Sequence, residues 1–157
     1  MVVIGCYLDE YVIRSLGFPK RSYKHESGKG KVLEQVRKRP NAIGMVDEDP
    51  SSNQPRDMEN YVETASGPGL KLLTRKKDDG KRIIVIRPRL EEWILLRANQ
   101  HRISPKDHGL PTDAHGWKSI LHIEKGKSFQ EFFQKLLDSN DEEIEKLREW
   151  IHEALEG

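Results

Sequence analysis

The first fifty residues alternate between short apolar runs and segments of helical periodicity, and this alternation constrains the fold more than any other feature of the sequence. Residues 1–5 and 42–46 are short, apolar runs that contain β-branched side chains, which is typical of buried strands. Between them the sequence predicts a helix over 9–16, a strand over 20–26, and a helix that begins after Ser27 and ends before Pro40. This βαβαβ order predicts an α/β fold with a mostly parallel, Rossmann-like sheet and helices on its faces.

The middle of the chain predicts a loop followed by a β-hairpin. Residues 51–69 are rich in Ser, Asn, Pro and Gly, a composition typical of loops. Residues 70–88 predict two strands joined by a turn at Asp79-Gly80, because an Asp-Gly pair between apolar runs favours a tight hairpin turn. A helix with Trp93 in its buried face is expected over 89–103.

The C-terminal part is predicted to be helical. Pro and Gly residues over 104–117 indicate a loop, and amphipathic helices are expected from Phe129 to Leu137 and from Ile144 to Leu155, with Asn140 as the cap of the last one. The length is typical of one domain. We therefore expect a single domain over 1–157, with a core over 1–103 and a helical C-terminal extension over 117–157.

Negative charge is concentrated where the run 42–46 ends, at Asp47, Glu48 and Asp49. Ligands of open α/β sheets bind outside the carboxyl ends of the strands, which is where these side chains would lie. Carboxylates crowded together repel one another and raise one another's pKa, and a bound divalent cation removes that cost. Oxygen ligands favour Mg²⁺, Mn²⁺ or Ca²⁺, so Asp47 and Asp49 are candidate metal ligands, although Asp-x-Asp is also common in plain polar loops.

The net charge of +1 hides two basic segments and an acidic end. Nine Lys and Arg residues lie between Arg14 and Arg39, eight lie between Lys71 and Arg89, and eight acids follow from Asp138 onward. Basic segments suggest a polyanionic partner such as nucleic acid, although solvated faces of ordinary elements have the same composition. The candidate nucleic-acid-binding residues are Lys29, Lys31, Arg75, Lys76 and Lys77.

Lys29 and Lys31 belong to the stretch "SGKGKV", which lacks the pattern of a P-loop. A glycine-rich turn before a helix can still hold phosphate through backbone N–H groups and positive charge. Cys6 is the only cysteine, so an internal disulfide and a cysteine-cluster zinc site are excluded. No long apolar segment and no signal-like start are found, so we expect a cytoplasmic protein without a membrane partner.

The order of these segments resembles the TOPRIM family, the metal-dependent domain of topoisomerases, primases and overcoming-lysogenization-defect nucleases. The resemblance covers about residues 1–50, through "VVIG", "CYLDEYVIRSLG", "KHESGKGKVLEQV" and "AIGMVDEDP". A second stretch, "RPRLEEWILL", is similar to a Pro-Glu-Trp segment of small TOPRIM-like proteins of phage-defence and mobile elements. The resemblance implies a Mg²⁺- or Mn²⁺-dependent nuclease or nicking protein, with Asp47, Asp49 and Glu91 as metal ligands.

One position departs from the family pattern. Where the family has Glu-Gly after its first strand, this chain has Gly5-Cys6, so the resemblance implies that Asp9 or Glu10 replaces the usual catalytic Glu. Three hypotheses follow: a TOPRIM-like nuclease, a catalytically degenerate TOPRIM-like module that binds nucleic acid or a protein partner, and a receiver-like phosphoacceptor. A receiver has its acidic pair directly after the first strand, which this chain lacks. The sequence does not show whether the substrate is DNA or RNA, or whether the protein forms a homo-oligomer.

Overall fold

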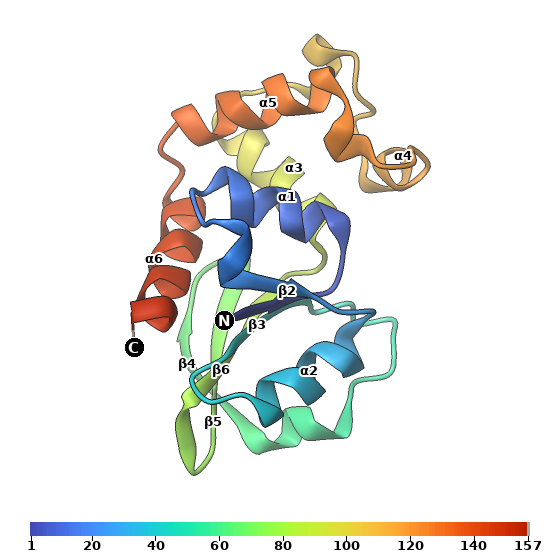
Figure 1. The fold of residues 1–157 in the computed structure, drawn as a ribbon. Coiled ribbons are helices and arrows are strands. Elements are labelled where there is room, and N and C mark those ends of the chain that lie inside the picture. Colours follow the sequence, from blue (N-terminus) through green and yellow to red (C-terminus); the bar gives the residue numbers. More distant parts are fainter. Residues whose placement is uncertain (157) are drawn as a thin grey trace.

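The fold was analysed in a computed structural model that describes residues 1–156, apart from the side chain of Asp79. One mixed sheet forms the centre of the molecule, and helices cover both of its faces (Figure 1). The strands are β1 (Val2–Ile4), β2 (Tyr23–His25), β3 (Ile43–Asp47), β4 (Tyr61–Ser66), β5 (Leu70–Arg75) and β6 (Asp78–Ile86). The α-helices are α1 (Tyr7–Ser15), α2 (Lys29–Lys38), α3 (Leu90–Gln100), α4 (Ala114–Lys118), α5 (Lys127–Asp138) and α6 (Glu142–Glu156). Short 3₁₀ turns include η2 (Arg56–Asn60), η3 (Pro105–His108) and η4 (Ile123–Lys125).

The strands follow the order β2-β1-β3-β6-β5-β4 across the sheet. β2, β1, β3 and β6 are parallel, whereas β5 and β4 continue the sheet as antiparallel strands. The prediction of an α/β fold with a mostly parallel sheet, a hairpin and a helical C-terminal part is therefore confirmed. Register places His25, Ile4 and Met45 side by side, so the carboxyl ends of β2, β1 and β3 lie along one edge.

Side chains from alternate positions of β1 pack into two separate apolar clusters. Val2 and Ile4 pack with residues of α1, α3, α5 and α6, which lie together on one face of the sheet (Figure 1). Val3 packs with Val32, Leu33 and Val36 of α2 on the other face. Both faces of β1 are thus buried, as expected for a central parallel strand.

Two predicted features of the middle segment are wrong. Residues 61–66, predicted to belong to a loop, form β4 at the edge of the sheet, where most of its side chains remain exposed. The hairpin turns at Lys76 and Lys77, because Lys77 adopts a φ of 67° and Arg75 pairs with Asp78. The predicted turn pair Asp79-Gly80 therefore lies within β6.

The caps of two helices also differ from the prediction. Gly28, with a φ of 94°, precedes α2 in place of the predicted cap Ser27. Before α6, the cap is Asp141 and not Asn140, because the Asp141 carboxylate accepts hydrogen bonds from the Glu143 and Ile144 amides. Asn140 forms the tight turn that precedes it, with a φ of 55°.

The C-terminal helices share the core of the parallel sheet. Trp117 of α4, predicted to lie in a loop, is buried with Phe129 and Phe132 of α5, in the same cluster as Trp93 of α3. The expectation that Trp93 is a core residue is confirmed, since it is 1% exposed. Residues 117–156 are therefore integral to the apolar core that also contains α1 and α3.

An ion network fixes α6 against α3. The Asp141 carboxylate is fully buried and accepts hydrogen bonds from Arg97 Nε at 3.0 Å and Nη2 at 2.7 Å. His101 Nε2 lies 2.7 Å from the same carboxylate. Glu143 accepts a hydrogen bond from the Gly69 amide and so connects α6 to the loop before β5. Among residues 1–156, no helix is both long and apolar enough to cross a membrane.

A substitution of Gly44 in β3 can test how closely α2 packs against the sheet. A methyl group there would lie 2.9 Å from Ile83 Cδ1 and 3.0 Å from methyl carbons of Val32 and Val36, all closer than ordinary contact. We expect Gly44→Ala to lower the free energy of unfolding by about 1–3 kcal/mol, measured by urea denaturation. In the control Gly30→Ala a methyl group meets nothing within 4 Å, so no loss is expected. Equal stability of the two variants would contradict this packing.

Candidate functional site

A cavity of about 610 Å³ opens at the carboxyl ends of β1 and β3. The N-terminal ends of α1 and α2 border it, and the loop after β3 covers it. Its lining includes Asp9, Lys29, Asp47, Asp49 and Gln54. The prediction that a site lies beyond the end of the run 42–46 thus coincides with a cavity at that edge of the sheet.

Asp9 is held at this edge by the turn that joins β1 to α1. The Cys6 thiol caps α1 by accepting a hydrogen bond from the Asp9 amide, and Asp9 Oδ2 accepts from the amides of Gly5 at 3.2 Å and Cys6 at 3.1 Å. The side chain is buried, with 6% exposed. Burial raises the pKa of Asp9 to about 6, although the two amides and the Cys6 thiol oppose this shift and Glu91 adds to it.

Asp47 is the last residue of β3 and faces the start of α3. Its Oδ1 accepts a hydrogen bond from the Leu90 amide at 3.1 Å. The pKa of Asp47 is raised to about 7. Burial is the main cause, and the negative charges of Asp9 and Glu91 add to the shift. Asp9 and Glu91 thus disfavour the charged form of Asp47, and Glu91 disfavours the charged form of Asp9.

Glu91 completes this group from the first turn of α3. Burial raises the pKa of Glu91. Its Oε2 is buried and has no hydrogen-bond partner among residues 1–156, although such an atom normally finds one. We call Asp9, Asp47 and Glu91 the carboxyl cluster; Asp9 and Asp47 line the cavity, whereas Glu91 is not among its lining residues and acts on both through its charge.

Two lysines supply positive charge beside the carboxyl cluster. Lys29 Nζ donates to the Glu48 carbonyl at 2.9 Å and to the Gln54 side chain, and burial lowers the pKa of Lys29. Lys118 of α4 lowers the pKa of both Asp47 and Glu91 through its charge. No local pattern points to Lys118, because the tertiary packing of Trp117 places the end of α4 at this edge.

Two predicted acidic residues do not join the carboxyl cluster. Asp49 borders the cavity, but it has a φ of 40°, and its Oδ1 lies 2.8 Å from Arg89 Nη2. The Ser51 hydroxyl and the Arg89 guanidinium lower the pKa of Asp49. Glu10 lies on another side of α1, where its Oε1 accepts a hydrogen bond from Tyr23 Oη at 3.0 Å.

The predicted nucleic-acid-binding residues separate into two places. Lys29 and Lys31 lie in the first turn of α2, at the carboxyl edge of the parallel strands. Arg75, Lys76 and Lys77 lie at the β5–β6 turn, at the opposite end of β6 from the register pair of Asp47 and Ile86.

At the β5–β6 turn, Arg75 and Lys76 make contacts within the fold. Its guanidinium pairs with Asp57 at 2.8 Å and lies over the Tyr61 ring. Lys76 Nζ donates to the Glu59 carbonyl at 3.0 Å. These contacts of Arg75 and Lys76 hold η2 against the β5–β6 turn, away from the carboxyl cluster, and nucleic-acid binding by Arg75, Lys76 and Lys77 stays a prediction.

The carboxyl cluster fits a hard divalent cation in its chemistry. It offers only oxygen donors, and Glu91 Oε2 is an acceptor without a donor among residues 1–156. However, among these residues no group of three or more His, Cys, Asp or Glu side chains already stands in a metal-binding arrangement. Binding would therefore require side-chain rotation of Asp47 or Glu91.

Comparisons of the chain with models of protein families, with curated proteins and with solved structures found no match. The main features of this edge of the sheet are three carboxyl groups with raised pKa values and two lysines whose charges act on them.

The raised pKa values of Asp9 and Asp47 predict how stability depends on pH without divalent cations. Both groups bind protons more tightly in the folded chain than in the unfolded one, so their contribution to stability is present below about pH 4 and is lost as pH rises through about 6 to 7. Asp47→Asn keeps an acceptor for the Leu90 amide and removes the charge. We expect it to raise the free energy of unfolding at pH 8 by more than about 1 kcal/mol.

Urea denaturation between pH 4 and pH 8, in the presence of a chelator, measures this effect. Asp107→Asn, which changes an exposed side chain in η3, is the matched control and should leave the pH dependence as in wild type. The difference in free energy of unfolding between Asp47→Asn and wild type should therefore change with pH. If it stays constant, the pKa of Asp47 is not raised in the folded chain.

Proposed function

We propose that this chain is a TOPRIM-like, Mg²⁺- or Mn²⁺-dependent nuclease that nicks or cleaves the phosphodiester backbone of nucleic acid. One observation carries the proposal: Asp9 and Asp47 line one cavity at the carboxyl ends of parallel strands, and the negative charge of Glu91 raises the pKa of both. Repulsion of this kind is costly for a fold unless a cation or a proton compensates it. Sites of this kind, with several perturbed acids beside a cavity, are candidate functional sites.

Asp47 and Glu91 would hold the cation, with Asp9 beside them. When bound, a divalent ion supplies charge stabilisation for the attacking and leaving oxygens of a phosphodiester. Glu91 Oε2 supports this assignment, since it is a buried acceptor without a donor among residues 1–156. Asp49 would contribute less than the sequence suggests, because Arg89 occupies its Oδ1.

The chain's own residues account for proton transfer and phosphate binding. Asp9, with a pKa of about 6, can accept a proton from an attacking water and release it again near neutral pH. The backbone amides of Gly5 and Cys6 fix the orientation of its Oδ2. Lys29 and Lys118 lie beside the carboxyl groups and can offset the negative charge of a bound phosphate.

A second candidate function is a catalytically degenerate module that binds nucleic acid or a protein partner. Gly5 favours it, because this glycine stands where the TOPRIM family has its catalytic Glu. The Gly5 and Cys6 amides donate to Asp9 Oδ2. Asp9 can replace that Glu only if its carboxylate takes part in the reaction while these two hydrogen bonds are present. The two candidates therefore differ in what removal of the Asp9 charge does.

Asp9→Asn should lower Mn²⁺-dependent nicking of supercoiled DNA, or cleavage of RNA, by about 10²–10⁴-fold. Asparagine keeps an acceptor for the Gly5 and Cys6 amides, so the fold should persist. Glu10→Gln is the matched control, since its side chain keeps the acceptor for Tyr23 Oη and lies outside the carboxyl cluster. Gel assays of nicked, linear and intact substrate give the rates.

The controls separate the two candidate functions. Nuclease activity in wild type and in Glu10→Gln, with its loss in Asp9→Asn, is the expected result. If wild-type protein cleaves neither DNA nor RNA with Mg²⁺ or Mn²⁺, the enzyme proposal fails and the binding module remains. Equal rates in Asp9→Asn and wild type would instead remove Asp9 from the reaction.

A further inference from the structure

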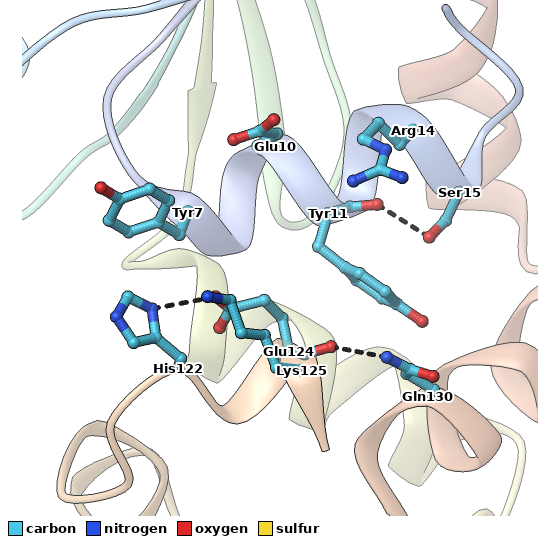
Figure 2. A pocket seen from close by; sticks show the side chains of 9 residues that line it. All are labelled: Tyr7, Glu10, Tyr11, Arg14, Ser15, His122, Glu124, Lys125 and Gln130. Carbon is cyan, nitrogen blue, oxygen red and sulfur yellow. Dashed lines mark hydrogen bonds and ion pairs between the residues drawn. The ribbon is translucent and has the colours of Figure 1, made fainter. Parts of the chain in front are cut away.

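A second cavity, of about 640 Å³, lies between α1 and the segment formed by η4 and the start of α5 (Figure 2). Tyr7, Glu10 and Arg14 border it from α1, and His122 and Lys125 border it from the other side. It shares no lining residue with the cavity of the carboxyl cluster. Both cavities nevertheless adjoin the first turn of α1, which carries Tyr7 and Asp9.

Tyr7 and His122 line this second cavity, and His25 stacks on Tyr7 from outside the lining. The Tyr7 side chain is a large apolar group that remains 56% exposed. Its ring stacks on His25 with a centroid separation of 5.0 Å and an interplanar angle of 17°. The His122 ring meets Tyr7 edge-on, at 5.1 Å and 69°. We call Tyr7, His25 and His122 the aromatic platform.

Two cations, Arg14 and Lys125, border the cavity (Figure 2). Within residues 1–156 neither forms a salt bridge or a side-chain hydrogen bond. The nearby acids are already engaged, because Glu10 accepts from Tyr23 Oη and Glu124 Oε1 lies 3.3 Å from His122 Nδ1. Glu10 and Glu124 keep their negative charges and balance the two cations in the lining, but Arg14 and Lys125 have no direct partner among residues 1–156 and lie beside exposed aromatic surface.

The platform lies along the same sheet edge as the carboxyl cluster. His25 ends β2 and is paired with Ile4, which is paired in turn with Met45 of β3, two residues before Asp47. Two strand spacings separate β2 from β3, a distance of about 10 Å. Stacked nucleotides repeat at about 3.4 Å along a strand, so the platform would lie within about three nucleotides of a phosphate at Asp47.

We propose that the aromatic platform, with Arg14 and Lys125, binds single-stranded nucleic acid, and this inference rests on the proposed nuclease function because it names the form of that substrate. A base stacks on the exposed rings, and the cations contact the phosphates next to it. Stacking platforms combined with positive charge are the usual means of binding single strands without sequence preference. In a duplex the base faces are already covered, so the platform discriminates against double-stranded substrate.

Tyr7→Leu tests the inference by removing the ring from an exposed position. Fluorescence anisotropy with labelled oligothymidylate and oligouridylate, in a chelator that prevents cleavage, measures affinity. Loss of one stacked base should weaken binding by about 5- to 100-fold. Tyr7→Phe keeps the ring and should bind as wild type does, and a labelled duplex of the same length should bind more weakly than either single strand.

Charge controls complete the experiment. Arg14→Ala with Lys125→Ala should weaken binding and reduce its dependence on salt, whereas Lys106→Ala, an exposed lysine of η3 outside both cavities, should not. Equal affinity of Tyr7→Leu and wild type, or equal affinity for duplex and single strand, would overturn the inference.

Mn²⁺ calorimetry on the same variants distinguishes this failure from failure of the proposed function. Tyr7→Leu should bind Mn²⁺ as wild type does, while Asp47→Asn should not bind it. Unchanged single-strand affinity in Tyr7→Leu together with intact Mn²⁺ binding refutes only the aromatic platform. Absence of Mn²⁺ binding in wild type refutes only the metal-dependent function.

Discussion

Burial and mutual repulsion of Asp9, Asp47 and Glu91 place a cost on this fold that its other contacts must offset. The carboxyl groups come from the first turn of α1, the end of β3 and the first turn of α3. β1, β3 and β6 are parallel neighbours, so the segments that follow these three strands begin at one edge of the sheet. Acids with raised pKa values beside a cavity are candidate functional residues.

Backbone amides hold part of this arrangement. Gly5 and Cys6 donate to Asp9, and Leu90 donates to Asp47, so both carboxyl groups are hydrogen-bonded to the backbone. The C-terminal helices also affect the carboxyl cluster, through the position of α4. The packing of Trp117 against α5 positions α4, and through it Lys118, which reduces the repulsion between Asp47 and Glu91. The helical extension is thus part of the site as well as of the core.

The sequence predicted the parallel part of the fold well, because alternating apolar runs and helical segments leave few alternatives. β4 was missed because an edge strand with one paired side and mostly exposed residues has no clear apolar alternation. Asp9 and Asp47 could be predicted from their positions after strands. The orientations of Glu10 toward Tyr23 and of Asp49 toward Arg89, and the approach of Lys118, depend on tertiary contacts that no local pattern encodes.

A crystal structure of the protein soaked in Mn²⁺ tests the central claim most directly, because anomalous scattering locates the ion independently of activity. We predict one peak at the carboxyl cluster, about 2.0–2.4 Å from oxygens of Asp47 and Glu91 after rotation of their side chains. A peak only at Asp49 or elsewhere on the surface, or no peak at saturating Mn²⁺, would contradict the account.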